Sequence, residues 1–265
     1  MPRSIAFVAD KLGGHAPIDF PPSLDEAGAL LEWPGLVMTG SDAAGQFVAG
    51  SNCSDWTAAG NQPLLLGDSQ GGTDLFSFSA YTVCTSPRPI YCAGTGINRP
   101  LQVERANGRV ASTSSAGFAP WLGIGTADQL CAREARSAGL QGSFKALLAT
   151  YGASAVSRFD VSGAPWVRTD GIPIVAAARD LASAKLLAAV GVTTAGVHLT
   201  GRPIARTGAS SPATPGTSES TCSSWSSSAP ALSGVGFPQS TNPSFWFGTL
   251  TDPCTYQYPV VCLQE

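Results

Sequence analysis

The chain has 265 residues, of which 12% are charged, and its formal net charge is 15 − 18 = −3. It contains no cluster of Lys and Arg of the kind that neutralises phosphates, so we expect no nucleic-acid partner. No stretch of about 18 apolar residues occurs, which argues against a membrane-spanning helix. The 30 glycines and 20 prolines favour short strands and long loops over a helical bundle.

In chain order, the first elements are expected within residues 1–93. The segments 5–9 and 64–66 are apolar, and 73–78 alternates between apolar and polar residues as a half-buried strand does. Residues 94–107, with two glycines and a proline, are expected to form a connector.

The residues from 108 onward show clearer local signals. A strand is predicted at 109–115. Thr126 is predicted to cap a helix, because Gln129 follows at the capping-box spacing, and Gly139 to end it. A second helix is predicted to begin at Ser143 and to stop at Gly152.

A hairpin is predicted around Asp170-Gly171, a strong signal for a two-residue turn, with strands at 165–168 and 172–174. The charged residues of this front region are expected to form structural ion pairs: Lys145, Arg158, Arg168 and Asp170. The chain contains no phosphate-binding glycine loop, dinucleotide fingerprint or metal-spaced group of His and Cys.

Seven cysteines occur without a C-x-x-C pair, at positions 53, 84, 92, 131, 222, 254 and 262. Disulfides are therefore expected rather than a zinc site or a redox motif, and with them an extracellular or periplasmic location. Residues 1–12 lack the basic start and the apolar stretch of a secretory signal. Either a signal was removed, or the reading frame begins inside a longer gene.

The cysteines belong to an internal repeat. The sequence Cys-Ser-Asp-Trp at 53–56 recurs as Cys-Ser-Ser-Trp at 222–225. From the first cysteine of each copy, the next follows after 31 or 32 residues, and the last lies 8 residues later in both. Residues 1–93 therefore parallel 171–262, and residues 108–170 form a front half that the first copy lacks.

The order of strand, two helices, hairpin and long disulfide-closed loops resembles the C-type-lectin-like fold, in particular a bacterial branch related to the endostatin domain of collagen XVIII. The residues that carry the resemblance are 128–131, 138–142, 144–146, Trp166, 170–171, 222–225 and 90–92. The resemblance implies an α+β fold with one complete copy at 108–265 and one N-terminally truncated copy at 1–93.

The family pattern also implies the disulfides Cys131–Cys262, Cys222–Cys254 and Cys53–Cys84. Cys92 is then left without a partner, because the residue matching Cys131 would lie upstream of Met1. The truncated copy also lacks partners for its apolar segments. The second copy, another protomer in a homo-oligomer, or a new packing would have to cover them, and we expect a large interface between the copies.

Sugar-binding C-type lectins hold calcium with a Glu-Pro-Asn or Gln-Pro-Asp tripeptide and a Trp-Asn-Asp tripeptide, and none of these is present. The loops of the first copy are rich in acidic residues, so Asp42, Asp55, Asp68 and Asp74 are candidate calcium ligands. Solvated turn residues are the alternative. The candidate ligand-binding residues are Asp55, Asn61, Asp68, Asp74 and Trp246. Trp56 and Trp225, which match in the repeat, are expected to be core anchors rather than sugar-stacking rings.

A different function is indicated by residues 67–71, which fit the G-x-S-x-G pattern of a nucleophile elbow with Ser69 as nucleophile. His15 and His198 are the candidate bases, and Asp19, Asp170 or Asp180 the orienting acid. A glycine-rich turn with ordinary surface histidines is the alternative. The sequence therefore predicts an extracellular recognition or adhesion module that binds carbohydrate or protein, with a hydrolase whose site lies between the copies as the second hypothesis.

Overall fold

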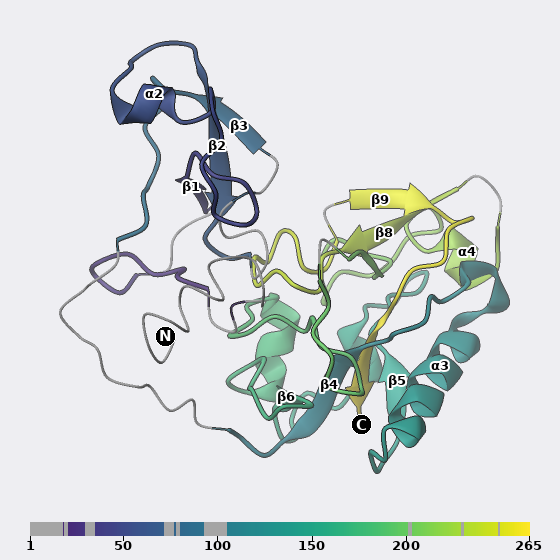
Figure 1. Ribbon diagram of the computed structural model, residues 1–265. Helices are drawn as coiled ribbons and strands as arrows, with labels where there is room; N and C mark the ends of the chain where they lie inside the picture. The colour runs from purple at the N-terminus through teal and green to yellow at the C-terminus, as the bar shows by residue number, and fades with distance from the viewer. Residues whose placement is uncertain are drawn as a thin grey trace. The chain divides into compact units, whose positions relative to one another are not determined.

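The computed structural model describes residues 18, 21–29, 35–71, 77, 80–92, 105–200, 203–228, 231–248 and 250–265. The chain divides into two compact units, unit 1 (Met1–Val103) and unit 2 (Glu104–Glu265). Both contain short strands, and unit 2 adds a 14-residue helix, so the fold is mixed α+β (Figure 1). The boundary between the units falls inside the predicted connector 94–107.

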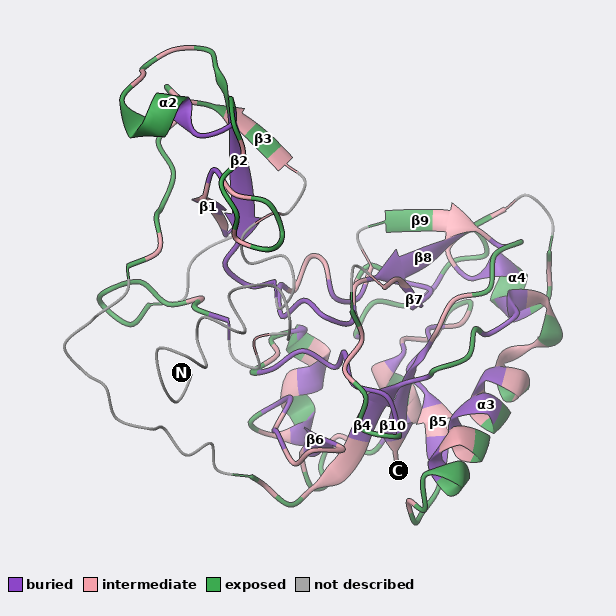
Figure 2. Ribbon diagram, in the orientation of Figure 1, coloured by how far each residue is buried: buried purple, intermediate pink, exposed green. Residues whose placement is uncertain are grey.

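Unit 1 contains an antiparallel sheet in the order β1-β2-β3. The elements are β1 (Leu36–Met38), the short turn α2 (Cys53–Trp56), β2 (Pro63–Asp68) and β3 (Ala80–Val83). The central strand β2 is buried from its second residue onward, as its continuous apolar run 64–66 favours, whereas α2 is largely exposed (Figure 2). The disulfide Cys53–Cys84 ties α2 to the residue that follows β3.

Unit 2 contains a four-stranded sheet in the order β5-β10-β4-β6, in which β4 and β6 are parallel and the other neighbours are antiparallel. Its strands are β4 (Arg109–Thr113), β5 (Phe144–Ala146), β6 (Trp166–Arg168) and β10 (Val261–Gln264). Helix α3 (Ile124–Ser137) packs against β5 and β10. The buried disulfide Cys131–Cys262 joins the helix to the inner strand β10.

A second antiparallel sheet of unit 2 has the order β7-β8-β9. Its elements are β7 (Ala205–Arg206), the short turn α4 (Cys222–Trp225), β8 (Leu232–Gly236) and β9 (Leu250–Pro253). Short 3₁₀ helices lie at η1 (Pro120–Leu122), η2 (Val156–Arg158) and η3 (Ala178–Ser183). The disulfide Cys222–Cys254 ties α4 to the end of β9. The three disulfides are the pairs that the resemblance implies, and Cys92 is free and exposed.

The sheets β1-β2-β3 and β7-β8-β9 have the same order and the same four-residue register between their last two strands. In unit 1 the main-chain N–H groups of 39–40 both donate to the Leu65 carbonyl, at 3.2 and 3.1 Å. In unit 2 those of 207–208 both donate to the Gly234 carbonyl, at 3.0 and 3.2 Å. The hydrogen bonds therefore match at the positions that the sequence repeat pairs.

The two turns that carry the loop cysteines have a left-handed backbone. All four residues of α2 have φ between 51° and 65°, and all four of α4 have φ between 49° and 63°. The fourth residue of each turn donates its N–H to the carbonyl of the residue before the turn, at 3.0 Å in α2 and 2.6 Å in α4. This geometry costs an L-residue about 1–2 kcal/mol, so runs of four are rare. The repeated Cys-Ser-x-Trp sequence adopts the same rare conformation twice.

The first predicted helix exists, but its predicted start is wrong. Helix α3 begins at Ile124 with Gly123 in the capping position, and the Thr126 hydroxyl donates instead to the Leu122 carbonyl at 2.8 Å. The predicted end is confirmed. Gly139 has φ +73°, and two bonds close the last turn, from Gly139 to Arg136 (3.0 Å) and from residue 140 to residue 135 (2.9 Å).

The second predicted helix, from Ser143 to Gly152, is wrong, because residues 144–146 form the edge strand β5. Phe144 and Ala146 are buried and Lys145 points away from the core, which is the two-residue period of a strand. Pairing with β10 outweighs the weak helical spacing of the apolar residues. The strand prediction for 109–115 is confirmed for β4, which is two residues shorter.

The predicted hairpin is present with a longer loop. β6 pairs with the following segment through the bridge of Val167 with Pro173. The N–H of Arg168 donates to the Ile172 carbonyl at 2.8 Å, which leaves a three-residue loop rather than two. Gly171, at φ +80°, occupies the left-handed position of this loop.

The predicted segment 5–9 lies outside the described residues, and so does 73–78 apart from residue 77. Within the described ranges, no helix combines the length and apolar character needed to cross a membrane. The ion pairs expected in the front region are present: Arg158–Asp128 (2.6 Å), Lys145–Glu265 (2.5 Å) and Arg168–Asp170 (2.5 Å).

Candidate functional site

A fully buried arginine organises the loop that follows β9. The side chain of Arg206 donates from Nη1 to the Ser233 hydroxyl (2.5 Å) and the Asp252 carbonyl (3.0 Å). From Nη2 it donates to the carbonyls of Pro253 (2.6 Å) and Tyr256 (2.8 Å). Burial lowers the pKa of Arg206 and the charge of Asp252 opposes this, and a guanidinium remains charged at physiological pH. Three of the four acceptors belong to residues 252–256, so these charge-assisted bonds fix the end of β9 and the loop that follows it.

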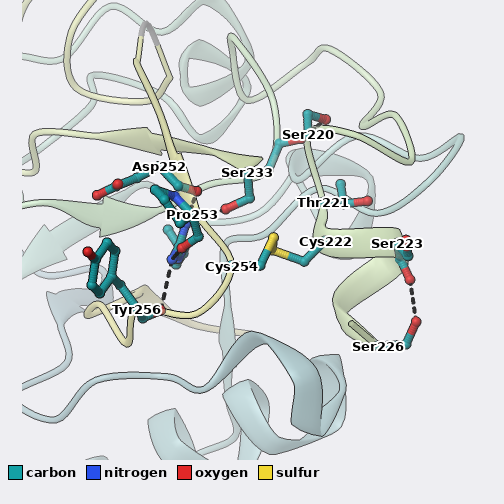
Figure 3. Close-up of a disulfide and its surroundings, with 12 residues drawn as sticks. Ser220, Thr221, Cys222, Ser223, Ser226, Ser233, Asp252, Pro253, Cys254 and Tyr256 are labelled. Carbon is teal, nitrogen blue, oxygen red and sulfur yellow. Dashed lines mark hydrogen bonds between the residues drawn. A yellow bond between two sulfur atoms is a disulfide. The ribbon is translucent and has the colours of Figure 1, made fainter. Parts of the chain in front are cut away.

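A second tie comes from the disulfide Cys222–Cys254, which lies within this loop and connects it to α4 (Figure 3). The Thr221 hydroxyl, just before α4, accepts from the Ser224 N–H at 3.0 Å and so supports the left-handed turn. The disulfide and the arginine together hold both sides of the loop on the β7-β8-β9 sheet.

Two tyrosines and a carboxylate, of Tyr256, Tyr258 and Asp252, lie in the segment that Arg206 and the disulfide hold. The Tyr258 hydroxyl donates to Asp252 Oδ2, and the Tyr258 ring centroid lies 4.8 Å from the guanidinium carbon of Arg206. Burial, followed by the interaction with Asp252, raises the pKa of Tyr258 to about 12, so its hydroxyl stays protonated. The Tyr256 ring centroid lies 6.2 Å from that of Tyr258, and Tyr256 is 54% exposed. We call Asp252, Tyr256 and Tyr258 the loop surface.

Hydroxyl groups are frequent on the two segments that the disulfide Cys222–Cys254 joins. The exposed Ser and Thr residues of 217–226 and 250–256 are Thr217, Ser218, Ser223, Ser224, Ser226, Thr251 and Thr255. Aromatic rings pack on the apolar faces of pyranoses, and carboxylates and hydroxyls bond to their hydroxyl groups. The loop surface therefore has the chemistry needed to bind a carbohydrate.

The structure brings two of the predicted catalytic residues together in unit 2. His198 Nε2 lies 3.9 Å from Asp170 Oδ2. Asp170 also accepts from Arg168 at 3.0 and 2.5 Å. Burial alone raises the pKa of Asp170, but the bonds and charge of Arg168 outweigh it, so the pKa lies below its usual range. The third candidate acid, Asp180, accepts from the Ala177 N–H at 2.9 Å, at the start of η3.

The predicted nucleophile, Ser69, is fully buried in the turn after β2, where its N–H donates to the Gly35 carbonyl at 3.0 Å. Among the described residues, no group forms a hydrogen bond with its hydroxyl. The candidate base His15 and the candidate acid Asp19 lie outside the described residues, and His198 belongs to unit 2. The hydrolase hypothesis stays a prediction.

The carboxylates of the predicted calcium site have local partners. Asp42 is exposed and accepts from two main-chain N–H groups of its own turn, at 2.9 and 2.8 Å. Asp55 accepts from the Asn52 amide at 2.7 Å, and Asp68 from the N–H two residues later at 2.9 Å. Asp74 lies outside the described residues. In the part of the chain that the structure describes, no group of three or more His, Cys, Asp or Glu could hold a metal. Calcium binding stays a prediction.

The three tryptophans singled out by the sequence have different surroundings. Trp225 is fully buried and its Nε1 donates to the Ala149 carbonyl at 2.8 Å, as expected for a core anchor. Trp246 is also fully buried, with Nε1 donating to the Ala184 carbonyl at 2.7 Å, so its predicted role in ligand binding is corrected to a core role. Trp56 is 54% exposed, so the core role predicted for it is wrong. Asn61 is exposed before β2.

In comparisons with known proteins, no family model and no curated protein matches the chain. Sequence reasoning missed Arg206 and the loop surface. One signal was available, because Arg206 directly precedes Thr-Gly at 207–208, whereas Met38 precedes the matching pair in the first copy. A charge at a repeat position that is otherwise apolar indicates a specific buried role.

Proposed function

We propose that this protein is an extracellular recognition or adhesion module of the C-type-lectin-like type, and that it binds carbohydrate through the loop surface of unit 2. The observation that carries the proposal is the buried Arg206, whose bonds to the carbonyls of Asp252 and Tyr256 hold the main chain at a carboxylate and at an exposed tyrosine. Because the loop is already held in place, it loses less conformational entropy when a ligand binds, which suits recognition of a weakly binding ligand such as a sugar.

The proposal includes the ancestry of the two units. We take residues 36–92 and 205–262 to be copies of one lectin-like unit. The matched strand register, the matched left-handed turns and the matched disulfides support this. The same disulfides support an oxidising, extracellular or periplasmic location.

A glycan array tests the carbohydrate proposal. The purified chain should bind a subset of glycans, and Tyr256→Ser should weaken binding about tenfold, the equivalent of about 1.4 kcal/mol. Asp252→Asn should weaken it by a similar factor, since the amide keeps only one acceptor oxygen and loses the negative charge. The matched control is Tyr81→Ser, because Tyr81 is 63% exposed on β3 of unit 1. Absence of glycan binding, or equal losses in Tyr256→Ser and the control, would contradict the proposal and leave a protein ligand as the alternative.

Calcium dependence is tested separately. If the acidic loops of unit 1 bind calcium, the ion at millimolar concentration should raise the melting temperature and EDTA should reverse the shift, because a ligand of the folded state stabilises it. Asp42→Asn, which alters one of the predicted ligands, should abolish the shift. An unchanged melting temperature would remove calcium from the proposal and leave the sugar site intact.

A further inference from the structure

The positive charge of Arg206 is not accessible at the loop surface. Its side chain is fully buried, and Nη1 and Nη2 donate two hydrogen bonds each to the four acceptors described above. These two nitrogens carry four N–H groups between them, so neither keeps a donor for a ligand. The fifth N–H, on Nε, is buried. An acidic group of a ligand therefore finds no donor at Arg206.

The segments that form the loop surface supply no other cation. Among residues 203–265, Arg206 is the only Lys, Arg or His. The same residues contain three acids, at positions 219, 252 and 265, the last of which is paired with Lys145. Residues 114–118, which bond to 258–260 through the main chain, contain no charged residue. The side chains that these segments place around Asp252 are therefore acidic or neutral.

The carboxylate of Asp252 keeps one oxygen for a ligand. Oδ2 accepts from the Tyr258 hydroxyl. Among the described residues, none donates to Oδ1, and none forms an ion pair with Asp252. The Tyr258 ring is itself held against the guanidinium of Arg206, with the ring centroid 4.8 Å from the guanidinium carbon. Asp252 therefore presents an oriented carboxylate oxygen to solvent.

Tyr256 supplies an aromatic face next to this oxygen. It is 54% exposed, whereas Tyr258 is half-buried. The Tyr256 ring centroid lies 6.2 Å from that of Tyr258, and Tyr258 also carries the hydroxyl that bonds to Asp252. Tyr256 and Asp252 are therefore both direct neighbours of one side chain. In Figure 3 the side chains of Tyr256 and Asp252 extend to the same side, away from the disulfide.

We propose that the loop surface selects sugars that carry a free, protonated amino group over neutral and acidic sugars. The ammonium group of such a sugar donates to Asp252 Oδ1, and the apolar face of its ring packs on Tyr256. The electron-rich face of Tyr256 also attracts a cation. An acidic sugar meets the carboxylate of Asp252 without an accessible cation, which opposes its binding. The inference rests on the proposed carbohydrate binding and names the class of sugar.

Two oligosaccharides that differ in charge test the inference. A glucosamine oligomer and its N-acetylated form share the same ring and linkage, but only the first bears ammonium groups in slightly acidic buffer. Isothermal titration calorimetry with the full chain should give an affinity for the amino form about five- to tenfold higher, which is the difference between a charge-assisted and a neutral hydrogen bond. A galacturonic acid oligomer, which is acidic, should bind more weakly than either.

Asp252→Asn tests whether the carboxylate causes the preference. Asparagine has the same shape and keeps an oxygen that accepts from the Tyr258 hydroxyl, so the loop should keep its structure. The ratio of the two affinities should fall to about one. The matched control is Glu26→Gln, which removes one negative charge at an exposed position of unit 1. It should leave the ratio unchanged, because the preference comes from the loop surface and not from the net charge.

The salt concentration gives a second readout that needs no variant. Sodium chloride screens an ion pair at an exposed site. The preference for the amino form should therefore shrink as the salt concentration rises, while the affinity for the acetylated form stays nearly constant. A preference that does not change with salt would contradict an ion pair at Asp252.

Four results would overturn the inference. Equal affinities for the amino and acetylated oligomers, or tighter binding of the acidic one, would refute the selectivity and leave the carbohydrate proposal in place. An equal loss of preference in Glu26→Gln and Asp252→Asn would assign it to net charge. Competition by an oligolysine peptide as strong as that by the glucosamine oligomer would mean that the surface binds cationic peptides. Absence of binding to every oligomer would refute the carbohydrate proposal as well.

Discussion

Replacing Arg206 with methionine tests whether one buried cation holds the loop surface in place. Methionine occupies the matching position 38 of unit 1 and has a similar length. The change leaves four acceptors without their donors: the Ser233 hydroxyl and the carbonyls of Asp252, Pro253 and Tyr256.

The expected loss follows from opposing terms. Each charged hydrogen bond is worth about 1.5–3 kcal/mol, and the four are not additive. Removing the guanidinium also removes the cost of burying a charge, which is several kcal/mol. We expect a net loss of about 3–5 kcal/mol, the range for breaking a buried charged network from one side. In a unit of about 160 residues this lowers the melting temperature by about 6–20 °C.

Differential scanning calorimetry measures the effect, with Arg136→Met as control, because Arg136 is exposed on α3. The control should change stability by less than about 0.5 kcal/mol. Arg206→Lys should lie between the two, since an ammonium group cannot reach all four acceptors. A loss below about 1 kcal/mol for Arg206→Met would refute the reasoning, and the loop would then be held by the disulfide alone.

Three further changes test the core and the network. Gly208→Ala should destabilise the protein more than Gly139→Ala in urea unfolding. Both glycines have positive φ (+81° and +73°), but only the methyl group at 208 would meet the buried indole of Trp225, at 2.7 Å. Equal losses of stability would contradict this. Removing the disulfide with Cys131→Ala and Cys262→Ala should cost about 5 kcal/mol for a sequence separation of 131, and a loss under about 2 kcal/mol would count against the chain-entropy estimate. Because the pKa of Tyr258 is raised on folding, its protonated hydroxyl adds to the stability of the folded protein in full below pH 10, and this contribution is lost as the pH rises to about 12. Tyr258→Phe should therefore flatten the fall in stability over this pH range. An unchanged slope of stability against pH would show that ionisation of the Tyr258 hydroxyl does not contribute to this fall.

The sequence repeat was informative because cysteine spacing constrains topology directly. Two cysteines that bond must lie within a few Å, so matched spacings at 53–92 and 222–262 predict matched strands. The mixed α+β class and the helix end at Gly139 follow from local chemistry and are confirmed, and the hairpin around 170–171 is present with a loop one residue longer than predicted.

Other features depend on contacts that a local pattern does not contain. Residues 144–146 form a strand because β10 lies beside them, and β10 is more than a hundred residues away in the sequence. The left-handed turns contradict the preference of L-residues, so no propensity predicts them. Trp56 and Trp225 have the same sequence context but opposite exposure, because the covering residues belong to a different part of the chain.

The burial of the cysteines also bears on how the protein responds to a reductant. The four cysteines that form the disulfides of unit 2 are all 0% exposed, whereas Cys84 in unit 1 is only half-buried. A small thiol in solution therefore reaches the Cys53–Cys84 disulfide of unit 1 first. Mild reduction would open the Cys53–Cys84 disulfide of unit 1 while the two disulfides of unit 2 stay closed, so the two units of one chain would differ in the redox conditions they tolerate.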